Sequence, residues 1–428
     1  MYNYSNSCKG RGESMNSSPV LGKDRIIIID VIRGFALFGI FLVNMPSFHS
    51  PYFMKSLYGI ESHFTGVDYW LDVFFALFVD MKFFTIFSFL FGIGFYIFMS
   101  RAEEKGQRIK RLYLRRILAL LLFGIVHLIA LWFGDILHTY AVAGVFLIFF
   151  YKRKIKTMII WGFSLLFVIN ALFGLTLILP DFILQEMQAD SNIQYNQSID
   201  EYIDVYENAG YAEWVSYRLG TEISTIALNL FTAIIPVFAM FLFGLAAGKA
   251  GIFRDVVKHL PFLKKIRLVS FLLSIPFVVI LALFLLDIVD LGIKKQFAVQ
   301  LFTSLSGASL CIFYISALTL LLQKESWQRR LRSLGSTGQM ALTNYLSQTI
   351  ISVIIFVGFG LYGNVSLLTG TLICFVIFAV QMAFSTFWLK KFRFGPFEWL
   401  WRSFTYGKFQ PMRKAGNSKN MMNHTTPM

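Results

Sequence analysis

His127 is the one histidine of the chain that lies inside a clearly apolar segment, and Asp135 follows near the end of that segment. Histidine is the side chain best suited to proton transfer near neutral pH. Ionisable groups inside a membrane are functional candidates by default. We therefore predict that His127 is a catalytic base and that Asp135 orients it. A neutral histidine that only hydrogen-bonds a neighbouring helix explains the same pattern.

The first apolar segment carries a second set of polar residues, in which Asp30 and Arg33 precede Asn44. Residues three apart share a helical face, so Asp30 and Arg33 can pair. Asn44 falls on nearly the same face, about 21 Å beyond Asp30 along the axis. A charge at the bilayer centre costs at least about 2.5–3.5 kcal/mol, so this stripe should face protein or a cavity. We expect the pair to lock one end of the bundle or to hold a charged donor there, with Asn44 closer to His127.

A polar face runs along the segment from residue 339 to residue 349. Its members recur at four-residue spacing: Gln339, Thr343, Asn344, Ser347 and Gln348. Hydrogen bonds between membrane helices, worth about 0.6 kcal/mol each, are the common role of such residues. The alternative is a path for a polar substrate.

The last apolar segment ends in the sequence Gly395-Pro-Phe-Glu398-Trp-Leu-Trp-Arg402. Gly-Pro ends the span and starts a short helix, on which Glu398 and Arg402 are four residues apart. Tryptophans favour the membrane interface, so the segment is either an interfacial anchor or a helix that closes a cavity near Asp30 and Arg33.

Several chemistries have no support in the sequence. The chain contains no GxxxxGK[ST], HExxH, GxSxG or CxxC motif, and these motifs are typical of nucleotide hydrolysis, zinc proteolysis, serine hydrolysis and thiol redox chemistry. Cys8, Cys311 and Cys374 are too far apart in sequence to predict a metal site, and they give no reason to expect a disulfide. No basic run alternates with aromatic residues on a soluble module, so nucleic acid is not a predicted partner.

These candidate residues must be positioned by membrane helices. Of the 428 residues 56% are apolar, 48 are Phe, and only 15% are charged, against about 25% in soluble domains. Apolar runs near 20 residues predict an all-α, multi-pass bundle of about ten transmembrane helices in the lipid bilayer. The predicted spans are 26–46, 76–100, 114–133, 136–151, 157–179, 224–248, 268–288, 297–322, 339–361 and 366–389. The 69–99 region is too long for one simple span and should hold an extra short helix before it.

The placement of charge predicts the orientation. Most of the 39 lysines and arginines lie in the two tails and in the loops 101–116, 152–156, 249–267 and 324–332. Alternate spans place all of these on one side, so the positive-inside rule predicts that both termini are cytoplasmic. The 180–223 loop on the other side is acidic and should be a helical cap or a lid over a substrate entrance. His49, His63 and His138 are expected on that side too, as solvated surface residues.

We divide the chain into five parts. These are a disordered tail (1–23), an N-terminal bundle (24–179), the acidic loop (180–223), a C-terminal bundle (224–409) and a second disordered tail (410–428). A faint repeat links the two bundles, because Phe89-Leu-Phe-Gly92 and Phe241-Leu-Phe-Gly244 each precede a basic loop.

The chain resembles the YeiB-like family of bacterial membrane proteins, whose C-terminal half is a domain of unknown function. The resemblance covers nearly everything from residue 25 to residue 406. Its markers here are Asp30-Val-Ile-Arg33-Gly34 with Asn44, Gly124-Ile-Val-His127 with Gly134-Asp135, Ala341-Leu-Thr343-Asn344-Tyr345, and Gly395-Pro396-Phe-Glu398-Trp. The family implies a multi-pass protein of the bacterial cell membrane but no activity.

The first span is also similar, more distantly, to that of membrane acyltransferases that act on sugars, including the heparan glucosaminide acetyltransferase group. An acidic residue, an Arg-Gly pair and an asparagine followed by a histidine recur there, and Asp30, Arg33-Gly34 and Asn44 match them. The histidine does not align cleanly in this chain.

Three functions are left open by the sequence. An acyltransferase would move an acyl group from cytoplasmic acyl-coenzyme A to an envelope sugar or lipid, with His127 as base, Asp135 as its partner and Asn44 polarising the carbonyl. Asp30, Arg33, Glu398 and Arg402 would hold the donor, whose phosphates suit arginine. A transporter or exporter of a small solute, or a non-catalytic scaffold, would use the same charges differently.

Overall fold

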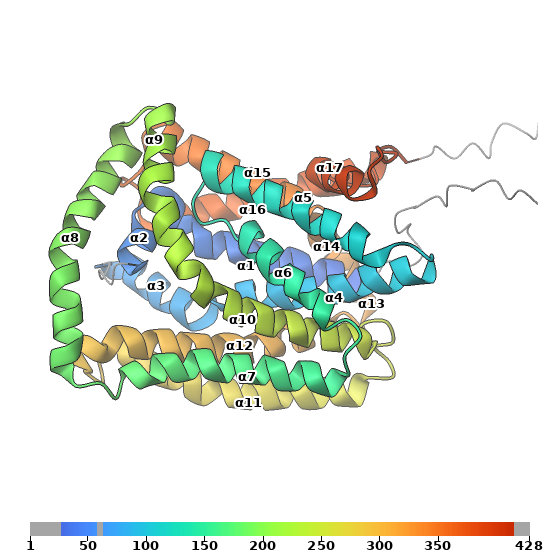
Figure 1. Ribbon diagram of the computed structural model, residues 1–428, viewed down its shortest axis with the longest axis horizontal. Helices are drawn as coiled ribbons and strands as arrows, with labels where there is room; N and C mark the ends of the chain where they lie inside the picture. The colour runs from blue at the N-terminus through green and yellow to red at the C-terminus, as the bar shows by residue number, and fades with distance from the viewer. Residues whose placement is uncertain (1–26, 58–62, 415–428) are drawn as a thin grey trace, which may run out of the picture.

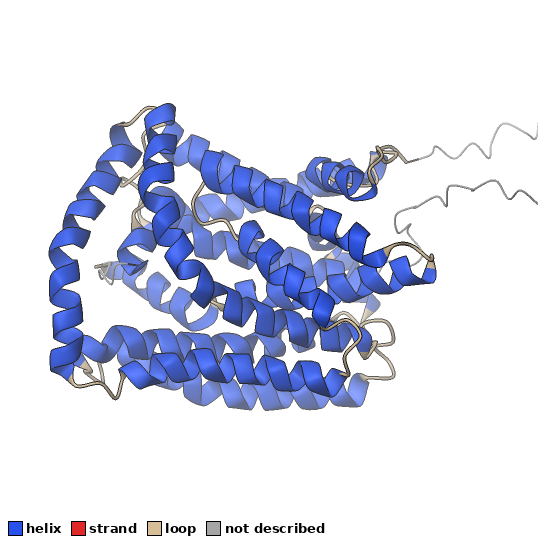
Figure 2. Cartoon of the chain, in the orientation of Figure 1, coloured by secondary structure: helices blue, strands red, loops and turns tan. Residues whose placement is uncertain are grey.

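The apolar segments fold into helices in the computed structural model, which describes residues 27–57 and 63–414 (Figure 1). Short loops join these helices (Figure 2). The predicted tail 1–23 and most of the predicted tail 410–428 lie outside the described residues. The long helices are α1 (Ile27–His49), α4 (Lys82–Glu104), α5 (Ile109–Ala130), α7 (Ile155–Thr176), α8 (Asp181–Asn208), α10 (Ile223–Lys249), α11 (Leu260–Leu285), α12 (Lys295–Leu321) and α16 (Leu367–Lys391). The shorter helices are α2 (Tyr52–Leu57), α3 (Gly66–Phe78), α6 (Leu137–Phe146), α9 (Tyr211–Tyr217), α13 (Glu325–Arg330), α14 (Arg332–Gln339), α15 (Ala341–Val353) and α17 (Pro396–Tyr406).

Nine helical segments in the described part of the chain are long and apolar enough to cross a membrane. The prediction of a polytopic all-α bundle is therefore confirmed. The fourth predicted span is the exception, because α6 and the turn after it cover only Leu137–Phe150. That length is about 21 Å, short of the roughly 30 Å of a bilayer core. The turn from α5 into α6, which carries Asp135, consequently lies within the bundle rather than at its end.

The predicted extra helix in the 69–99 region is confirmed as α3, which ends at Phe78 before α4 begins at Lys82. The break contains Met81, whose φ of 62° is unusual for a residue with a side chain. The buried Lys82 ammonium donates to the Ala76 carbonyl at 2.7 Å. This bond satisfies one of the carbonyls that the end of α3 leaves open.

The connections separate to the two ends of the bundle. Helices α13 and α17 lie at one end, whereas α2, α8 and α9 lie at the other, where α8 runs across the ends of the membrane helices (Figure 1). The basic loops between α4 and α5 and between α10 and α11 lie at the α13–α17 end. The structure thus keeps the alternation that the charge pattern requires, while the side of the membrane on which each end lies stays a prediction.

The repeated Phe-Leu-Phe-Gly motifs pack against each other. A Cβ added at Gly92 on α4 would lie 2.1 Å from the Phe241 carbonyl oxygen, and one added at Gly244 on α10 would lie 1.9 Å from the Phe89 carbonyl oxygen. The contact is therefore reciprocal, with each glycine admitting the backbone of the other helix. Close approach through small residues is typical of membrane helix pairs.

Replacing Gly244 with valine is expected to lower the free energy of unfolding by about 1–3 kcal/mol, because overpacked sites must shift backbone. Gly94→Val is the matched control, since a Cβ at Gly94 meets no atom within 4 Å. The midpoint of thermal unfolding in detergent should fall for Gly244→Val and stay level for Gly94→Val. Equal midpoints for the two variants would contradict the reciprocal contact.

Candidate functional site

The turn between α5 and α6 brings His127 and Asp135 together. His127 lies one turn before the end of α5, and the loop 131–136 reverses the chain into α6. Gly124 permits the return, because a Cβ there would lie 2.5 Å from the His138 backbone nitrogen and 2.9 Å from Asp135 Oδ2. The Gly124-Ile-Val-His127 segment of α5 is thus the surface against which the Asp135 turn packs.

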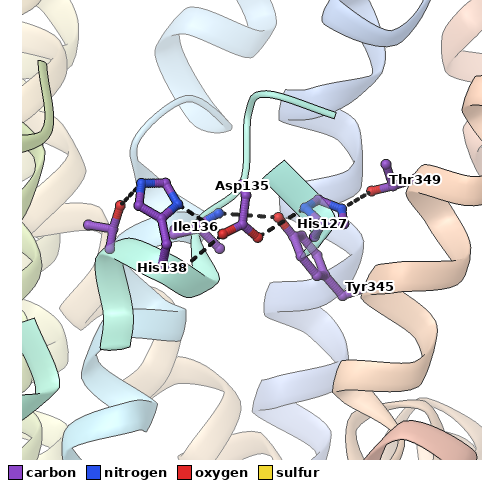
Figure 3. A network of polar contacts seen from close by, with 7 residues as sticks. His127, Asp135, Ile136, His138, Tyr345 and Thr349 are labelled. Carbon is purple, nitrogen blue, oxygen red and sulfur yellow. Dashed lines mark hydrogen bonds and ion pairs between the residues drawn. The ribbon is translucent and has the colours of Figure 1, made fainter. Parts of the chain in front are cut away.

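Asp135 lies between two imidazoles (Figure 3). Its Oδ1 is 3.0 Å from Nδ1 of His127, and its Oδ2 is 2.9 Å from Nδ1 of His138. The same Oδ2 accepts the backbone N–H of His138 at 2.8 Å, at the start of α6. All three side chains are buried. The contact between His127 Nδ1 and Asp135 Oδ1 is close but is not aligned as a hydrogen bond, unlike the contact to His138. A carboxylate at this distance still favours the His127 tautomer with its proton on Nδ1, which leaves Nε2 as a proton acceptor.

The free edge of the His127 ring faces α15. Its Nε2 is 2.9 Å from Oγ1 of Thr349. The Tyr345 ring, one turn earlier on α15, lies 5.2 Å from the imidazole between ring centres, and its hydroxyl accepts the Ile136 N–H at 3.4 Å. His127 and Thr349 are each only 1% exposed. The arrangement is a hydroxyl, an imidazole and a carboxylate in line, held away from water.

Two histidines that we expected at the surface are buried, so that expectation was wrong. His138 is 9% exposed and joins the Asp135 network. His49 is 2% exposed and packs beside the Phe356 ring, 5.6 Å between centres. His63 is exposed, as expected. Burial of His138 follows from the early turn after α5, which the apolar pattern alone does not reveal.

Most of the polar face on α15 is bonded to α16. The Asn344 amide donates to Ser385 Oγ at 2.9 Å, and the Gln348 amide donates to Gln381 Oε1 at 3.0 Å. Gln381 in turn donates to Ser347 Oγ at 2.8 Å. These bonds favour the interpretation that the polar face joins helices rather than lining a path. Gln339, at the end of α14, is half-buried.

Glu398 caps the start of α15. Its Oε1 accepts the backbone N–H groups of Leu342 and Thr343 at 2.6 and 3.1 Å, and its Oε2 accepts the Thr343 hydroxyl at 2.5 Å. Burial raises the pKa of the Glu398 carboxyl, although these hydrogen bonds oppose the shift. Gly395 is required beside it, because a Cβ there would lie 2.2 Å from Oε2.

Arginines gather at the same end of the bundle. Arg33 pairs with Asp30 at 2.9 Å, as the sequence predicts. Arg116 lies over the Trp401 ring at 3.6 Å, and Arg402 lies over the Phe394 ring at 4.5 Å. Arg116 thus contacts α17, which carries Arg402, and Arg33 contacts α14, since it donates to the Gly338 carbonyl at 3.4 Å.

Asn44 lies in the second half of α1, eleven residues beyond Arg33. It is half-buried on α1, four residues before Phe48, whose ring is 4.4 Å from that of Trp132 in the α5–α6 turn. Asn44 thus lies one helical turn before the point where α1 packs on the Asp135 loop, and no hydrogen bond joins Asn44 to His127 among the described residues. Sequence analysis did not identify Thr349 and Tyr345 as site residues. Their four-residue spacing, which puts them on one face of α15 away from the α16 contacts, is the only feature of the sequence that could have indicated them.

Comparison with known proteins places the chain in a family without an assigned activity. Residues 247–408 match the model of the family described as protein of unknown function (DUF418). The chain is 38% identical over 415 residues to the uncharacterized protein YxaH of Bacillus subtilis, covering 92% of this chain and 98% of that protein. It is 29% identical to the uncharacterized protein YeiB of Escherichia coli, covering 89% of this chain and 96% of that protein. No solved structure matches. The chain belongs to the DUF418 family and is homologous to YxaH and YeiB over nearly its full length.

Proposed function

We propose that this protein is a membrane acyltransferase that moves an acyl group from acyl-coenzyme A to a sugar or lipid of the bacterial envelope. The observation that carries the proposal is the buried His127, with a carboxylate on Nδ1 and a hydroxyl on Nε2. This is the geometry that a general base needs, because the partner fixes the tautomer and the opposite nitrogen meets the proton to be removed.

In the reaction, His127 Nε2 takes a proton from a nucleophilic hydroxyl or amine as that group attacks the thioester carbonyl carbon. The carbon–sulfur bond breaks, and the departing thiolate receives the proton. Asp135 stabilises the imidazolium that forms. The Asn44 amide donates to the carbonyl oxygen, where negative charge develops. Asn44 suits this role because it lies one helical turn before Phe48, whose ring packs on Trp132 in the turn that carries Asp135.

The spacing of charge along the helices favours a long donor. Arg33 precedes Asn44 by eleven residues on α1, and Arg116 precedes His127 by eleven on α5, or about 16 Å in each case. A donor with its anionic groups at the arginine end therefore needs a long, thin arm to reach the histidine. Acyl-coenzyme A has phosphates at one end of such an arm and a thioester at the other. Arg33 and Arg402 would bind the phosphates, with Asp30 orienting Arg33 and Glu398 holding α17 in place.

Ligand stabilisation tests the proposal. Coenzyme A should raise the unfolding midpoint of the purified protein, because a ligand at 100 times its dissociation constant adds about 2.7 kcal/mol. Pantetheine, which lacks the phosphates, should not. Arg402→Gln should abolish the shift, whereas Arg413→Gln, at an exposed position, should retain it. No shift at millimolar coenzyme A would count against the donor.

A transporter is the second candidate, and one observation favours it. Lys82 is 0% exposed at the break between α3 and α4, and broken helices with buried charges are typical of transporters. Solute flux that follows the proton gradient in vesicles, and that Lys82→Met abolishes, would support transport over acyl transfer.

A further inference from the structure

The hydroxyl in front of His127 belongs to the protein itself. Helical threonines commonly bond the carbonyl one turn earlier, as Thr319, Thr371 and Thr405 do here at 2.7, 2.7 and 2.8 Å. The Thr349 hydroxyl is instead 2.9 Å from Nε2 of His127. The structure thus directs one buried hydroxyl at the base that the proposed reaction requires.

Two segments far apart in sequence contribute to this line of groups. Asp135 comes from the turn after α5, His127 from α5 and Thr349 from α15, which is 222 residues beyond His127. Helix α5 packs mainly on α6 and α17. The His127–Thr349 contact therefore joins α5 to α15, which is not one of its main packing partners. A hydroxyl, an imidazole and a carboxylate in this order are the parts of an activated oxygen nucleophile.

We propose that Thr349 carries the acyl group as a covalent ester between the two half-reactions, an inference that rests on the acyltransferase function proposed above. Thr349 Oγ1 attacks the thioester carbonyl carbon while His127 Nε2 takes its proton. The carbon–sulfur bond breaks, and the departing thiolate receives that proton. An acceptor hydroxyl or amine then attacks the ester with His127 again as base, the carbon–Oγ1 bond breaks, and Oγ1 recovers the proton.

Burial gives this intermediate a reason to persist. Thr349 and His127 are each 1% exposed, and a site that excludes water protects a reactive ester from hydrolysis. A covalent intermediate also has a practical consequence, because it forms from the donor alone. Its detection therefore does not require the acceptor to be known.

The experiment uses membranes that contain the full-length protein, incubated with acetyl- or palmitoyl-coenzyme A labelled in the acyl group. Label is measured on the peptide that contains Thr349, by mass spectrometry, and in the envelope lipids and glycans. Thr349→Val removes the hydroxyl at nearly constant volume, and Thr349→Ser keeps it. Ser352→Ala is the matched control, because Ser352 is fully buried on the same helix and its hydroxyl has no hydrogen-bond partner among the described residues.

The wild type, Thr349→Ser and Ser352→Ala should carry label on this peptide and transfer it, whereas Thr349→Val should lose both by at least 100-fold. Envelope labelling without label on the Thr349 peptide, or undiminished labelling by Thr349→Val, would overturn the covalent step and leave the acyltransferase function standing. A wild type that carries no label on the Thr349 peptide and transfers none to the envelope would overturn both.

Discussion

Replacing Arg218 with methionine is expected to lower the free energy of unfolding by about 3–5 kcal/mol, because it leaves Glu222 buried without its charge partner. Arg218 is 0% exposed and Glu222 is 1% exposed, with Nε and Oε2 2.8 Å apart. Arg218 also donates to the Tyr206 hydroxyl at 3.1 Å and lies over the Trp214 ring at 3.9 Å. Equilibrium unfolding in mixed micelles measures the loss.

A double-mutant cycle separates the ion pair from packing. If Arg218→Met loses stability because the Glu222 carboxylate stays buried without a partner, then adding Glu222→Met should restore at least half of the lost free energy of unfolding. Apolar replacements of a whole buried ion pair are often near neutral. Additive losses would contradict this explanation. Arg218 additionally donates to the Ile129 carbonyl at 3.1 Å, at the end of α5. Arg218→Met alone should therefore also disturb the position of His127, which lies two residues before Ile129 on the same helix.

Asp135→Asn is expected to lower acyl transfer by about 10²–10⁴-fold with little loss of folded protein, the range that a positioned general base supplies. An amide has only one acceptor atom, and the His138 backbone N–H, which donates to Oδ2 at 2.8 Å, keeps that acceptor on the His138 side. The NH2 group of the new side chain then faces His127, which loses the acceptor for its Nδ1 proton. The tautomer with the proton on Nε2 then dominates, and it cannot act as the base. The measurement is the initial rate of label transfer in membranes with matched amounts of protein.

The control for Asp135→Asn is His138→Gln. His138 contacts the other carboxylate oxygen, so its replacement should leave the His127 tautomer intact and change the rate by less than about tenfold. A His138→Gln variant as inactive as Asp135→Asn would indicate that the cluster acts as a whole, contrary to separate roles for the two histidines.

The sequence predicts the membrane class and most of the helices, because apolar length is a local property that each segment carries by itself. It fails at α6, where the apolar run from 136 to 151 looks like a span but the chain reverses early over Gly124. This failure has a cause in the tertiary structure. The close approach of α6 to α5 depends on the absence of a side chain at Gly124, which hydropathy does not register. The same early turn explains why His138 is buried although it follows the end of an apolar segment.

The candidate site shows the same division. His127 and Asp135 are eight residues apart and could be linked from the sequence, as could Asp30 and Arg33 within one helical turn. Thr349 could not, because its contact with His127 joins helices 222 residues apart and no local pattern encodes such a pairing. The two Phe-Leu-Phe-Gly motifs were visible as a repeat, but only the structure shows that they pack on each other.

The proposed base can be tested by one measurement: the transfer of labelled acyl groups from acyl-coenzyme A to envelope lipids and glycans, in membranes that contain either the wild type or His127→Ala. Unfolding midpoints and coenzyme A binding establish that both proteins are folded and hold the donor. We predict that the wild type labels the envelope and that His127→Ala, which still binds the donor, does not. Equal labelling by the two proteins would contradict the assignment of His127 as the base, and with it the roles of Asp135 and Thr349 that depend on that base.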